Sequence, residues 1–393
     1  MRVQRIAIVV SHPIQHFCPQ YASFAKNPRV EIKVFFASAL GFKKYVDPSF
    51  GQEIAWDNLQ LDRFPHVFLN GDQVLPANRQ LDAPSLDAAL TAFAPAIVIT
   101  YGYFQKLQRR AYAWARRNRV PLAYISDSER RQHRSWWKEL IKYPFIKRYF
   151  SGIDYFLSVG EANEAFYKYY GVPEKKLVRM HFPIDIEQYA EASENYFLLR
   201  DKIRRQYGFA ESDIVLAVVG KLVPWKNQGD IIDAMGLLES RGIQTHLLIL
   251  GSGTMMNELQ KRALNLQRSK VHFCGFVHPS QLPGFYAATD IYVHPASAEP
   301  HSIAISEAIF MGCPVILSDR CGSYGKDDDV QEHLNGLVYP FGNIEALAQK
   351  LYEIITQPLQ LKSFASYSKT IGRKFQLRAH REVLTELLLR IKD

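Results

Sequence analysis

Short apolar runs alternate with longer amphipathic segments along most of the chain. In the first half, runs typical of buried strands lie at residues 6–10, 31–36, 96–100, 122–125 and 154–159. Segments with helical spacing of apolar positions lie at residues 19–25, 86–93, 107–119 and 161–170. Strands that alternate with helices predict a parallel sheet covered on both faces. Residues 42–78 break the pattern, and we interpret them as a long excursion with irregular strands.

The alternation starts again after residue 210. Apolar runs predict strands at residues 214–219, 245–250, 270–273, 291–294, 315–317 and 336–339, and helices at 228–239, 255–267, 281–287, 302–311 and 344–356. Residues 181–210 carry mixed charges and no clear strand, so we place the domain boundary there. The prediction is an α/β protein with two doubly wound, Rossmann-like domains, residues 1–190 and 191–372, that face each other across a cleft. An amphipathic helix is expected within residues 373–393, and both domains are open to it, with packing back on the N-terminal domain as one arrangement.

Length and composition fit two soluble domains. A chain of 393 residues is too long for one ordinary core. A hydrophobic fraction of 47% and a charged fraction of 22% are typical of a soluble globular protein, and no apolar run is long enough to span a bilayer. The first apolar run is too short for a signal peptide, and His12 and Pro13 follow it at once. The four cysteines lack CxxC or zinc-ligand spacing, which favours reduced thiols and a cytoplasmic location.

Two lysines follow the first strand of the second domain. Gly220 permits a tight turn, and Lys221 and Lys226 precede the next helix. Two cations beside a helix N-terminus suit a diphosphate, although a solvated loop with surface lysines explains the same residues. Gly251 and Gly253 end another strand, where a lone GxG favours close packing of a turn.

Residues 290–317 are predicted to form a strand, a loop, a helix and a second strand. A helix that starts at the carboxyl end of a parallel strand is a place where anions bind. Glu299 and Glu307 flank this joint, and they suit either a general acid–base pair or acceptors for the hydroxyls of a sugar and a ribose. A surface position is the alternative for Glu307, but its neighbours are apolar and a buried carboxylate needs a partner. The acidic run 327–329 resembles a metal-binding cluster, yet we expect a solvated loop there and predict no metal site.

The N-terminal half offers fewer chemical candidates. His12 and His16 follow the first strand, where a histidine with a structural role is the common outcome. Asp127 follows the strand at residues 122–125, where a carboxylate is able to orient a nucleophilic hydroxyl. Residues 130–150 combine basic and aromatic side chains in a chain whose net charge is +9. An anionic membrane surface, single-stranded nucleic acid and an ordinary helix with aromatic core residues are all compatible with this segment.

Together these residues resemble glycosyltransferase family 4, retaining enzymes that use nucleotide sugars and have the GT-B fold. Gly220, Lys221 and Lys226 are similar to its G-[R/K]-x(3,4)-K phosphate motif, and residues 249–253 are similar to its second glycine turn. Residues 275–277 match the segment that meets the nucleotide base, and Glu299 with Glu307 matches the E-x7-E signature. Residues 158–161 and 182–185 resemble the end of the family's first domain. The match covers roughly half of the chain, and the N-terminal half fits only in layout.

The resemblance implies a role for each matching residue. Lys221, Lys226 and the helix start at residues 302–303 would stabilise the departing diphosphate, so neither a metal nor another cofactor is expected. Glu299 would bind hydroxyls of the donor sugar, Glu307 the ribose diol, and residues 276–277 the base. The implied donor site comprises Gly220, Lys221, Lys226, Gly251, Gly253, Phe276, Val277, Glu299, His301, Ser302, Ile303, Ala304 and Glu307. The catalytic candidates are Lys221, Lys226 and Glu299, with Asp127 and His16 on the acceptor side.

The sequence departs from the family pattern at three places. His301 and Ser302 stand where many members have Phe-Gly. The loop at residues 12–16 lacks the usual Gly-Gly pair, and Ser126-Asp127 stands where many members have a histidine. The last two differences concern the acceptor side, whereas His301 concerns the fit of the donor.

The function expected from the resemblance is transfer of a hexose-type sugar from a UDP- or GDP-sugar to a hydroxyl of a saccharide or lipid-linked acceptor. Such a reaction belongs to polysaccharide or glycoconjugate biosynthesis. The alternatives are an epimerase or hydrolase of nucleotide sugars with the same fold, and a non-catalytic protein that binds nucleotide sugars. We expect a cytoplasmic protein that is peripheral at the inner face of a membrane through residues 130–150, with no nucleic-acid partner.

Overall fold

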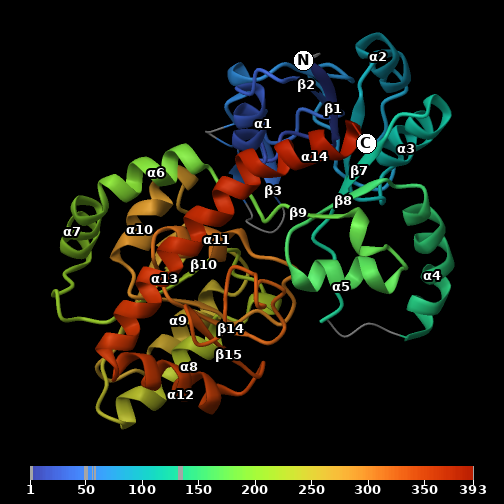
Figure 1. Cartoon of the computed structure of the whole chain (residues 1–393). Helices are drawn as coiled ribbons and strands as arrows, with labels where there is room; N and C mark the ends of the chain where they lie inside the picture. Colours follow the sequence, from blue (N-terminus) through green and yellow to red (C-terminus); the bar gives the residue numbers. More distant parts are fainter. Residues whose placement is uncertain (1–2, 48–51, 55, 57–58, 132–135, 393) are drawn as a thin grey trace.

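Two α/β domains lie side by side in the computed structural model, which describes residues 3–47, 52–54, 56, 59–131 and 136–392 (Figure 1). The sheet of the N-terminal domain is parallel and has seven strands in the order β5-β2-β1-β6-β7-β8-β9. They are β1 (Gln4–Val10), β2 (Val30–Phe36), β5 (His66–Phe68), β6 (Ile97–Tyr101), β7 (Leu122–Ile125), β8 (Tyr155–Ser158) and β9 (Leu177–Arg179). The short pair β3 (Tyr45–Asp47) and β4 (Gln52–Ile54) is antiparallel and separate from this sheet.

Strand β1 shows why this sheet is buried on both faces. Ile6 and Ile8 point into one hydrophobic cluster, whereas Ala7 and Val9 point into the other, as the two-residue period of a strand requires. The helices of this domain are α1 (Cys18–Ala25), α2 (Leu86–Phe93), α3 (Lys106–Asn118), α4 (Trp136–Ser151) and α5 (Glu161–Tyr169). No helix in the described part of the chain is long and apolar enough to cross a membrane.

The C-terminal domain has a parallel six-stranded sheet in the order β12-β11-β10-β13-β14-β15. Its strands are β10 (Val215–Val219), β11 (His246–Leu250), β12 (Lys270–Gly275), β13 (Ile291–His294), β14 (Val315–Ser318) and β15 (Gly336–Tyr339). The covering helices are α8 (Gly229–Ser240), α9 (Met256–Ala263), α10 (Leu282–Ala288), α11 (Ile303–Phe310) and α12 (Ile344–Ile355). The strand order reverses between β10 and β13, and such a reversal opens a crevice at the carboxyl ends of the two strands. Both predicted Rossmann-like sheets are therefore confirmed.

Residues 181–210, which the sequence left without an assigned element, contain two helices, α6 (Ile186–Glu194) and α7 (Tyr196–Tyr207). Asp185 caps α6, because its Oδ1 accepts a hydrogen bond of 3.2 Å from the backbone N–H of Gln188. Tyr189 and Ile203 place these helices in a core of the C-terminal domain. Their other faces are charged, which explains the mixed composition that hid them.

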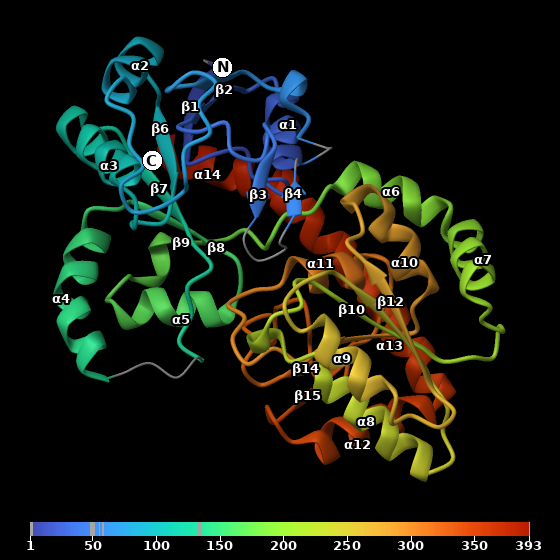
Figure 2. The same cartoon turned by 180° about the vertical axis from the view of Figure 1, so that it is seen from behind.

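The last helical segment joins the two domains. Helix α13 (Pro358–Leu377) continues through a short π-helix (Arg378–Glu382) into α14 (Val383–Lys392). The whole segment crosses from one domain to the other (Figure 2). Phe375 of α13 lies in the C-terminal core, whereas Leu384 of α14 lies in the N-terminal core. Between them, Gln376 donates to the carbonyl of Phe182 at 2.8 Å and accepts from the N–H of Ile184 at 2.9 Å. The helix thus fixes residues 181–184, the crossover segment, where the chain passes from the first domain to the second.

Replacement of Leu387 by alanine tests the contribution of α14 to stability. Leu387 is 1% exposed in the N-terminal core, so the cavity is expected to cost about 2–5 kcal/mol. Leu389 on the same helix is 60% exposed, and Leu389→Ala serves as the matched control. Thermal unfolding of both variants measures the difference, and equal melting temperatures would contradict this packing.

Candidate functional site

A cavity of about 350 Å³ lies in the cleft between the two domains, at the carboxyl ends of their strands. The N-terminal domain contributes Gln15, His16 and Trp56. The C-terminal domain contributes Val219, Gly220, Lys226, Leu250, Gly251, Phe276, Val277, Pro279, Leu282, Glu299, His301, Ser302, Ile303, Ala304 and Glu307. Most of the predicted donor residues are thus brought together, and His16 lies with them. Lys221, Gly253 and Asp127 are not among the residues that line the cavity.

Lys226 and Glu299 form an ion pair at the reversal of strand order. Lys226 ends a short 3-10 turn after β10, and Glu299 lies in the loop after β13. His294, at the end of β13, places its Nε2 3.4 Å from Oε2 of Glu299. Burial acts against ionisation of Glu299, but His294 and the charge of Lys226 prevail and lower its pKa from 4.5 to about 2. Glu299 is therefore a permanent hydrogen-bond acceptor at neutral pH, and it is poorly suited to act as a general acid.

Glu307 has the opposite electrostatic environment. It lies one to two turns into α11 and lines the cavity, with Oε2 accepting a hydrogen bond of 2.9 Å from the hydroxyl of Tyr286. Burial raises its pKa from 4.5 to about 7, although the hydrogen bond from Tyr286 and the nearby hydroxyl of Tyr189 act in the other direction. Glu307 consequently exchanges a proton near neutral pH. Glu307 therefore faces the cavity and not the outer helix surface, and Tyr286 is the hydrogen-bond partner of its partly buried carboxyl group.

Two glycine turns bring the backbone of the C-terminal domain close to the cavity. A Cβ atom on Gly251 would lie 1.9 Å from the carbonyl oxygen of Gly220, and its φ of +152° disfavours other residues. A Cβ atom on Gly253 would lie 2.4 Å from the carbonyl oxygen of Leu222. The carbonyl of Lys221 accepts a hydrogen bond of 2.9 Å from Gln228, so this loop is fixed by its backbone. These glycines permit the β10 and β11 turns to pack against each other.

The acidic run at residues 327–329 differs from its prediction as a solvated loop. Asp327 is exposed, but Asp328 and Asp329 are buried. Asp328 accepts hydrogen bonds of 3.0 Å from the N–H of Glu161 and of 3.2 Å from Arg179, which both belong to the N-terminal domain. These partners could not be predicted from the local sequence, because Arg179 and Glu161 lie 149 and 167 residues before Asp328 in the chain. Within the described residues, no group of three or more His, Cys, Asp or Glu side chains is arranged to hold a metal ion.

The acceptor-side candidates lie on the N-terminal face of the cleft. His16 is enclosed by Phe17 and Phe182, and burial together with the charge of His12 lowers its pKa to about 3. Asp127 is an exposed residue, and partial desolvation of its carboxyl group together with the charge of Glu299 raises its pKa against the attraction of His301. His16 is therefore uncharged at neutral pH, while Asp127 faces the donor residues across the cleft.

Several residues of the site carry no signal in the sequence. Trp56 and Gln15 line the cavity although they come from irregular loops of the N-terminal domain. Tyr189 and Tyr286 contact Glu307 from α6 and α10, which only the tertiary structure brings together. His294 is the exception, because its position at the end of a predicted strand next to the Glu299 loop marks it as a candidate.

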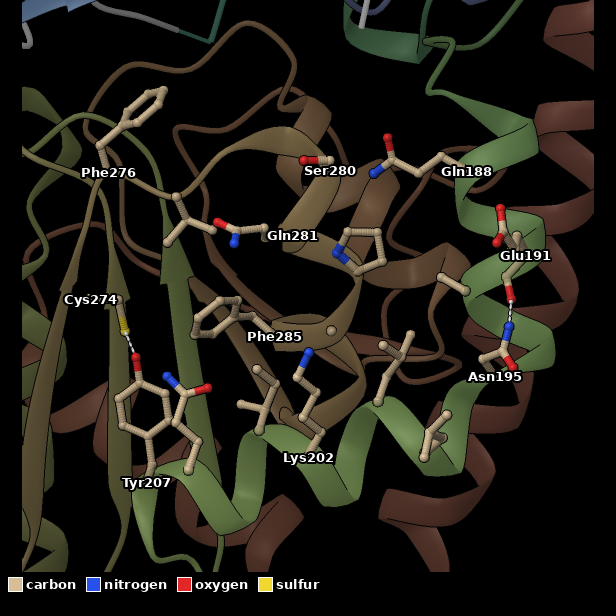
Figure 3. A pocket seen from close by; sticks show the side chains of 18 residues that line it. Gln188, Glu191, Asn195, Lys202, Tyr207, Cys274, Phe276, Ser280, Gln281 and Phe285 are labelled. Atoms are coloured by element: carbon tan, nitrogen blue, oxygen red, sulfur yellow. Dashed lines mark hydrogen bonds between the residues drawn. The ribbon is translucent and has the colours of Figure 1, made fainter. Parts of the chain in front are cut away.

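A second, larger pocket of about 710 Å³ lies beside this cavity, between α6, α7 and α10 (Figure 3). Phe276 and Val277 line both hollows, so the two adjoin at the end of β12. Glu191 and Lys202 are the charged residues of the larger pocket. The convergence of charged groups at the strand ends makes the smaller cavity the better candidate for chemistry.

Comparison with known proteins gives a match in the C-terminal domain. Residues 200–371 match the family model of glycosyl transferases group 1. The GDP-mannose-dependent monoacylated alpha-(1-6)-phosphatidylinositol monomannoside mannosyltransferase of Corynebacterium glutamicum is 27% identical over 189 residues, which are 46% of this chain and 48% of that protein. The mannosylfructose-phosphate synthase of Agrobacterium fabrum is 32% identical over 32% of this chain and 31% of that protein. The chain thus matches half or less of the length of these relatives.

Solved structures resemble the whole chain. A glycosyltransferase from Rickettsia africae superposes with a TM-score of 0.71 at 15% identity, covering 100% of this chain and 98% of that one. Anabaena HepE in complex with UDP gives a TM-score of 0.68 at 19% identity, covering 98% and 99% of the two chains. These likenesses, with two facing Rossmann-like domains, show that the chain has the GT-B fold, as predicted.

Replacement of Glu307 by glutamine tests its environment through stability. A carboxyl group whose pKa is raised to about 7 in the folded state favours folding at pH 5 and loses that contribution as pH rises through 7. Between pH 5 and 8 the wild-type melting temperature should fall, relative to Glu307→Gln, by about 3–6 °C. Glu211→Gln, at an exposed carboxyl group, is the control and should follow the wild type. Parallel curves for wild type and Glu307→Gln would show that the carboxyl group is solvated.

Proposed function

We propose that this chain is a retaining glycosyltransferase that moves a hexose-type sugar from a UDP- or GDP-sugar to a hydroxyl group. One observation carries the proposal: a single cavity at the reversal of strand order collects Lys226, the start of α11, Glu299 and Glu307. The relatives named above, which include a mannosyltransferase, support transfer of a sugar over epimerisation, hydrolysis or simple binding. The activities of the same relatives support a saccharide or lipid-linked acceptor, and with it a role in polysaccharide or glycoconjugate biosynthesis.

The diphosphate of the donor lies, in this proposal, between Lys226 and the start of α11. The first backbone N–H groups of a helix have no acceptor inside the helix, and the helix dipole favours an anion there. As the sugar leaves, negative charge grows on the diphosphate, and these fixed groups stabilise it without solvent reorganisation. Lys221 adds positive charge from the same loop. With this charge supplied by the protein, we propose that the reaction needs no metal ion.

The two glutamates bind the two hydroxyl-bearing parts of the donor. Glu299, held as a carboxylate, accepts hydrogen bonds from the sugar, and its pairing with Lys226 couples sugar and diphosphate recognition. Glu307 accepts from the ribose diol, and Phe276 and Val277, which line the same cavity, contact the base. The seven residues between the glutamates, with the family match at residues 200–371, support membership of the E-x7-E group, family 4, and retention of configuration.

The acceptor approaches from the N-terminal domain. Asp127 orients the acceptor hydroxyl, and its raised pKa in the cleft suits transient uptake of the hydroxyl proton. His16 is uncharged and enclosed by aromatic rings, so we assign it to shaping the acceptor side of the cavity. Closure of the domains over both substrates excludes water and limits hydrolysis of the donor.

Replacement of Lys226 by alanine tests the proposed function. The variant loses a charged hydrogen bond to the leaving diphosphate, and this loss should lower kcat/KM by about 10- to 1000-fold. The assay follows release of nucleoside diphosphate from UDP-glucose and GDP-mannose with mixed saccharide and lipid acceptors, with and without EDTA. Lys202→Ala, on α7 and outside the cleft cavity, is the control and should leave the rate unchanged. A rate that needs Mg²⁺ or Mn²⁺, or that survives Lys226→Ala, would contradict the role of the cleft.

Helix α4 is proposed to hold the protein at an anionic membrane surface. Trp136 is 74% and Phe145 is 71% exposed, and Leu140 and Ile141 are also exposed on this helix. Lys142 adds positive charge beside them, within a pocket of about 560 Å³ that is also lined by Arg79, Arg109 and Phe104. Aromatic rings next to cations suit the interface of a bilayer that contains acidic lipids. Of the basic segment at 130–150, residues 132–135 lie outside the described residues.

Vesicle binding tests this surface. Trp136→Ala with Phe145→Ala should reduce co-sedimentation with phosphatidylglycerol vesicles by about 10-fold or more, because both rings lose their insertion into the interface. Phe197→Ala is the control, since Phe197 is 83% exposed on α7 in the other domain. Binding by the wild type should weaken as salt is raised. Equal binding by the double variant and the wild type would rule out α4 as the contact.

A further inference from the structure

His301 is a buried histidine next to the start of α11. It precedes the helix by two residues, is 5% exposed and lines the cleft cavity. Its ring stacks on Phe182, with the ring centres 5.1 Å apart and the planes at 17°. Nε2 lies 3.0 Å from Oδ2 of Asp329. The imidazole is therefore fixed in position and in orientation.

Asp329 determines which nitrogen of His301 remains available. The Oδ2 atom of Asp329 also accepts a hydrogen bond of 2.5 Å from Ser306, and its backbone carbonyl accepts one of 2.9 Å from Asn335. A carboxylate held in this way requires a proton on Nε2 of His301. Nδ1 is buried and has no hydrogen-bond partner among the described residues. A buried polar atom without a partner requires an explanation, and a ligand in the cavity that the His301 side chain lines would supply one.

The backbone next to His301 strengthens this indication. The N–H of Ser302 donates to Oγ of Ser323 at 2.9 Å, so the protein itself occupies the first amide at this helix start. An anion at the start of α11 therefore loses one backbone donor. The imidazole of His301 supplies a donor from the adjacent residue in its place.

The groups around His301 are mostly acidic. Asp329 and Asp328 face it from the loop after β14, and Asp127 faces it across the cleft. His181 approaches from the crossover segment, but burial lowers the pKa of His181 well below 6.5, so it adds no charge at neutral pH. Burial of His301 disfavours its cation, yet the bond to Asp329 and the charges of the three aspartates prevail and raise its pKa above 6.5.

We propose that the imidazolium of His301 donates Nδ1–H to a phosphate oxygen of the bound nucleoside diphosphate, with Asp329 as its positioning residue. This inference rests on the proposed function and adds to it a titratable cation beside Lys226. During transfer, the bond from the anomeric carbon to the phosphate oxygen breaks, and its electron pair stays on that oxygen. The acceptor oxygen bonds to the anomeric carbon and its proton leaves to Asp127 or solvent. His301 keeps its own proton throughout and stabilises the diphosphate charge.

The decisive variant is His301→Gln. The glutamine amide reaches the place of Nε2 and preserves a donor to Asp329, but it has neither a group in the place of Nδ1 nor a charge. The nucleotide used is UDP or GDP, whichever raises the melting temperature of the wild type more. The affinity of His301→Gln for that nucleotide should be about 10- to 100-fold lower than the affinity of the wild type at pH 6. His301→Asn is the second variant, because it retains a neutral donor near Nδ1 and should lose less affinity.

The dependence on pH separates this role from a structural one. The advantage of the wild type over His301→Gln should be complete below the pKa of His301 in the free protein. It should disappear as pH rises through the higher pKa of His301 in the complex. Dissociation constants for both proteins are measured by calorimetry from pH 6 to 9, and their ratio cancels the ionisation of the nucleotide itself. Asp329→Asn should move the decline to lower pH, because it removes the strongest charge that favours the cation.

Controls and outcomes distinguish this inference from the proposed function. His333→Asn is the matched control, since His333 is exposed in the same domain and has a φ of +64°, which asparagine tolerates. It should behave as the wild type. If the wild type binds UDP or GDP but its titration parallels that of both His301 variants, the role of His301 is wrong and the donor site stands. If the wild type binds no nucleoside diphosphate at any pH, the proposed function fails and this inference fails with it.

Discussion

Ionisable groups that are buried where the two domains meet need partners, and the partners set the chemistry of the cleft. Glu299 is paired with Lys226 and stays charged, whereas Glu307 accepts a hydrogen bond from the hydroxyl of Tyr286 and takes up a proton near pH 7. Burial acts in the same direction on both carboxyl groups, so the difference between their pKa values comes from His294 and the cation Lys226, which both lie beside Glu299. The two glutamates, one in the loop before α11 and one within α11, therefore have different pKa values.

The same constraint connects the donor side to the N-terminal domain. Asp328 is buried in the C-terminal domain, but Arg179 and the N–H of Glu161 reach it from the other domain. Arg131 crosses in the same direction, donating to the carbonyls of Cys321 at 2.8 Å and Tyr324 at 2.9 Å. The loop that holds these groups also carries Asp329, the partner of His301. A change in the relative position of the domains therefore alters the charge beside the donor cavity.

The sequence predicts the parts of the site that follow from the order of the strands. Gly220 and Glu299 follow β10 and β13, which are adjacent because the strand order reverses there, so their meeting was foreseeable. The burial of Asp328 was not, because its cation comes from β9 of the other domain. Helix α13 was also not predicted. Its outer face is polar and it contacts both α11 and α12, so its apolar residues do not follow the simple spacing of a helix with one buried face. Sequence patterns thus predict local elements and strand ends, whereas partners from distant segments require the folded structure.

The most direct test of the cleft as donor site is a crystal structure of the protein with bound UDP-glucose or GDP-mannose. The diphosphate should lie between Lys226 and residues 301–304, the ribose diol on Glu307, and the base beside Phe276 and Val277. Nucleotide bound in the larger pocket between α6, α7 and α10, with the cleft cavity empty, would contradict this assignment.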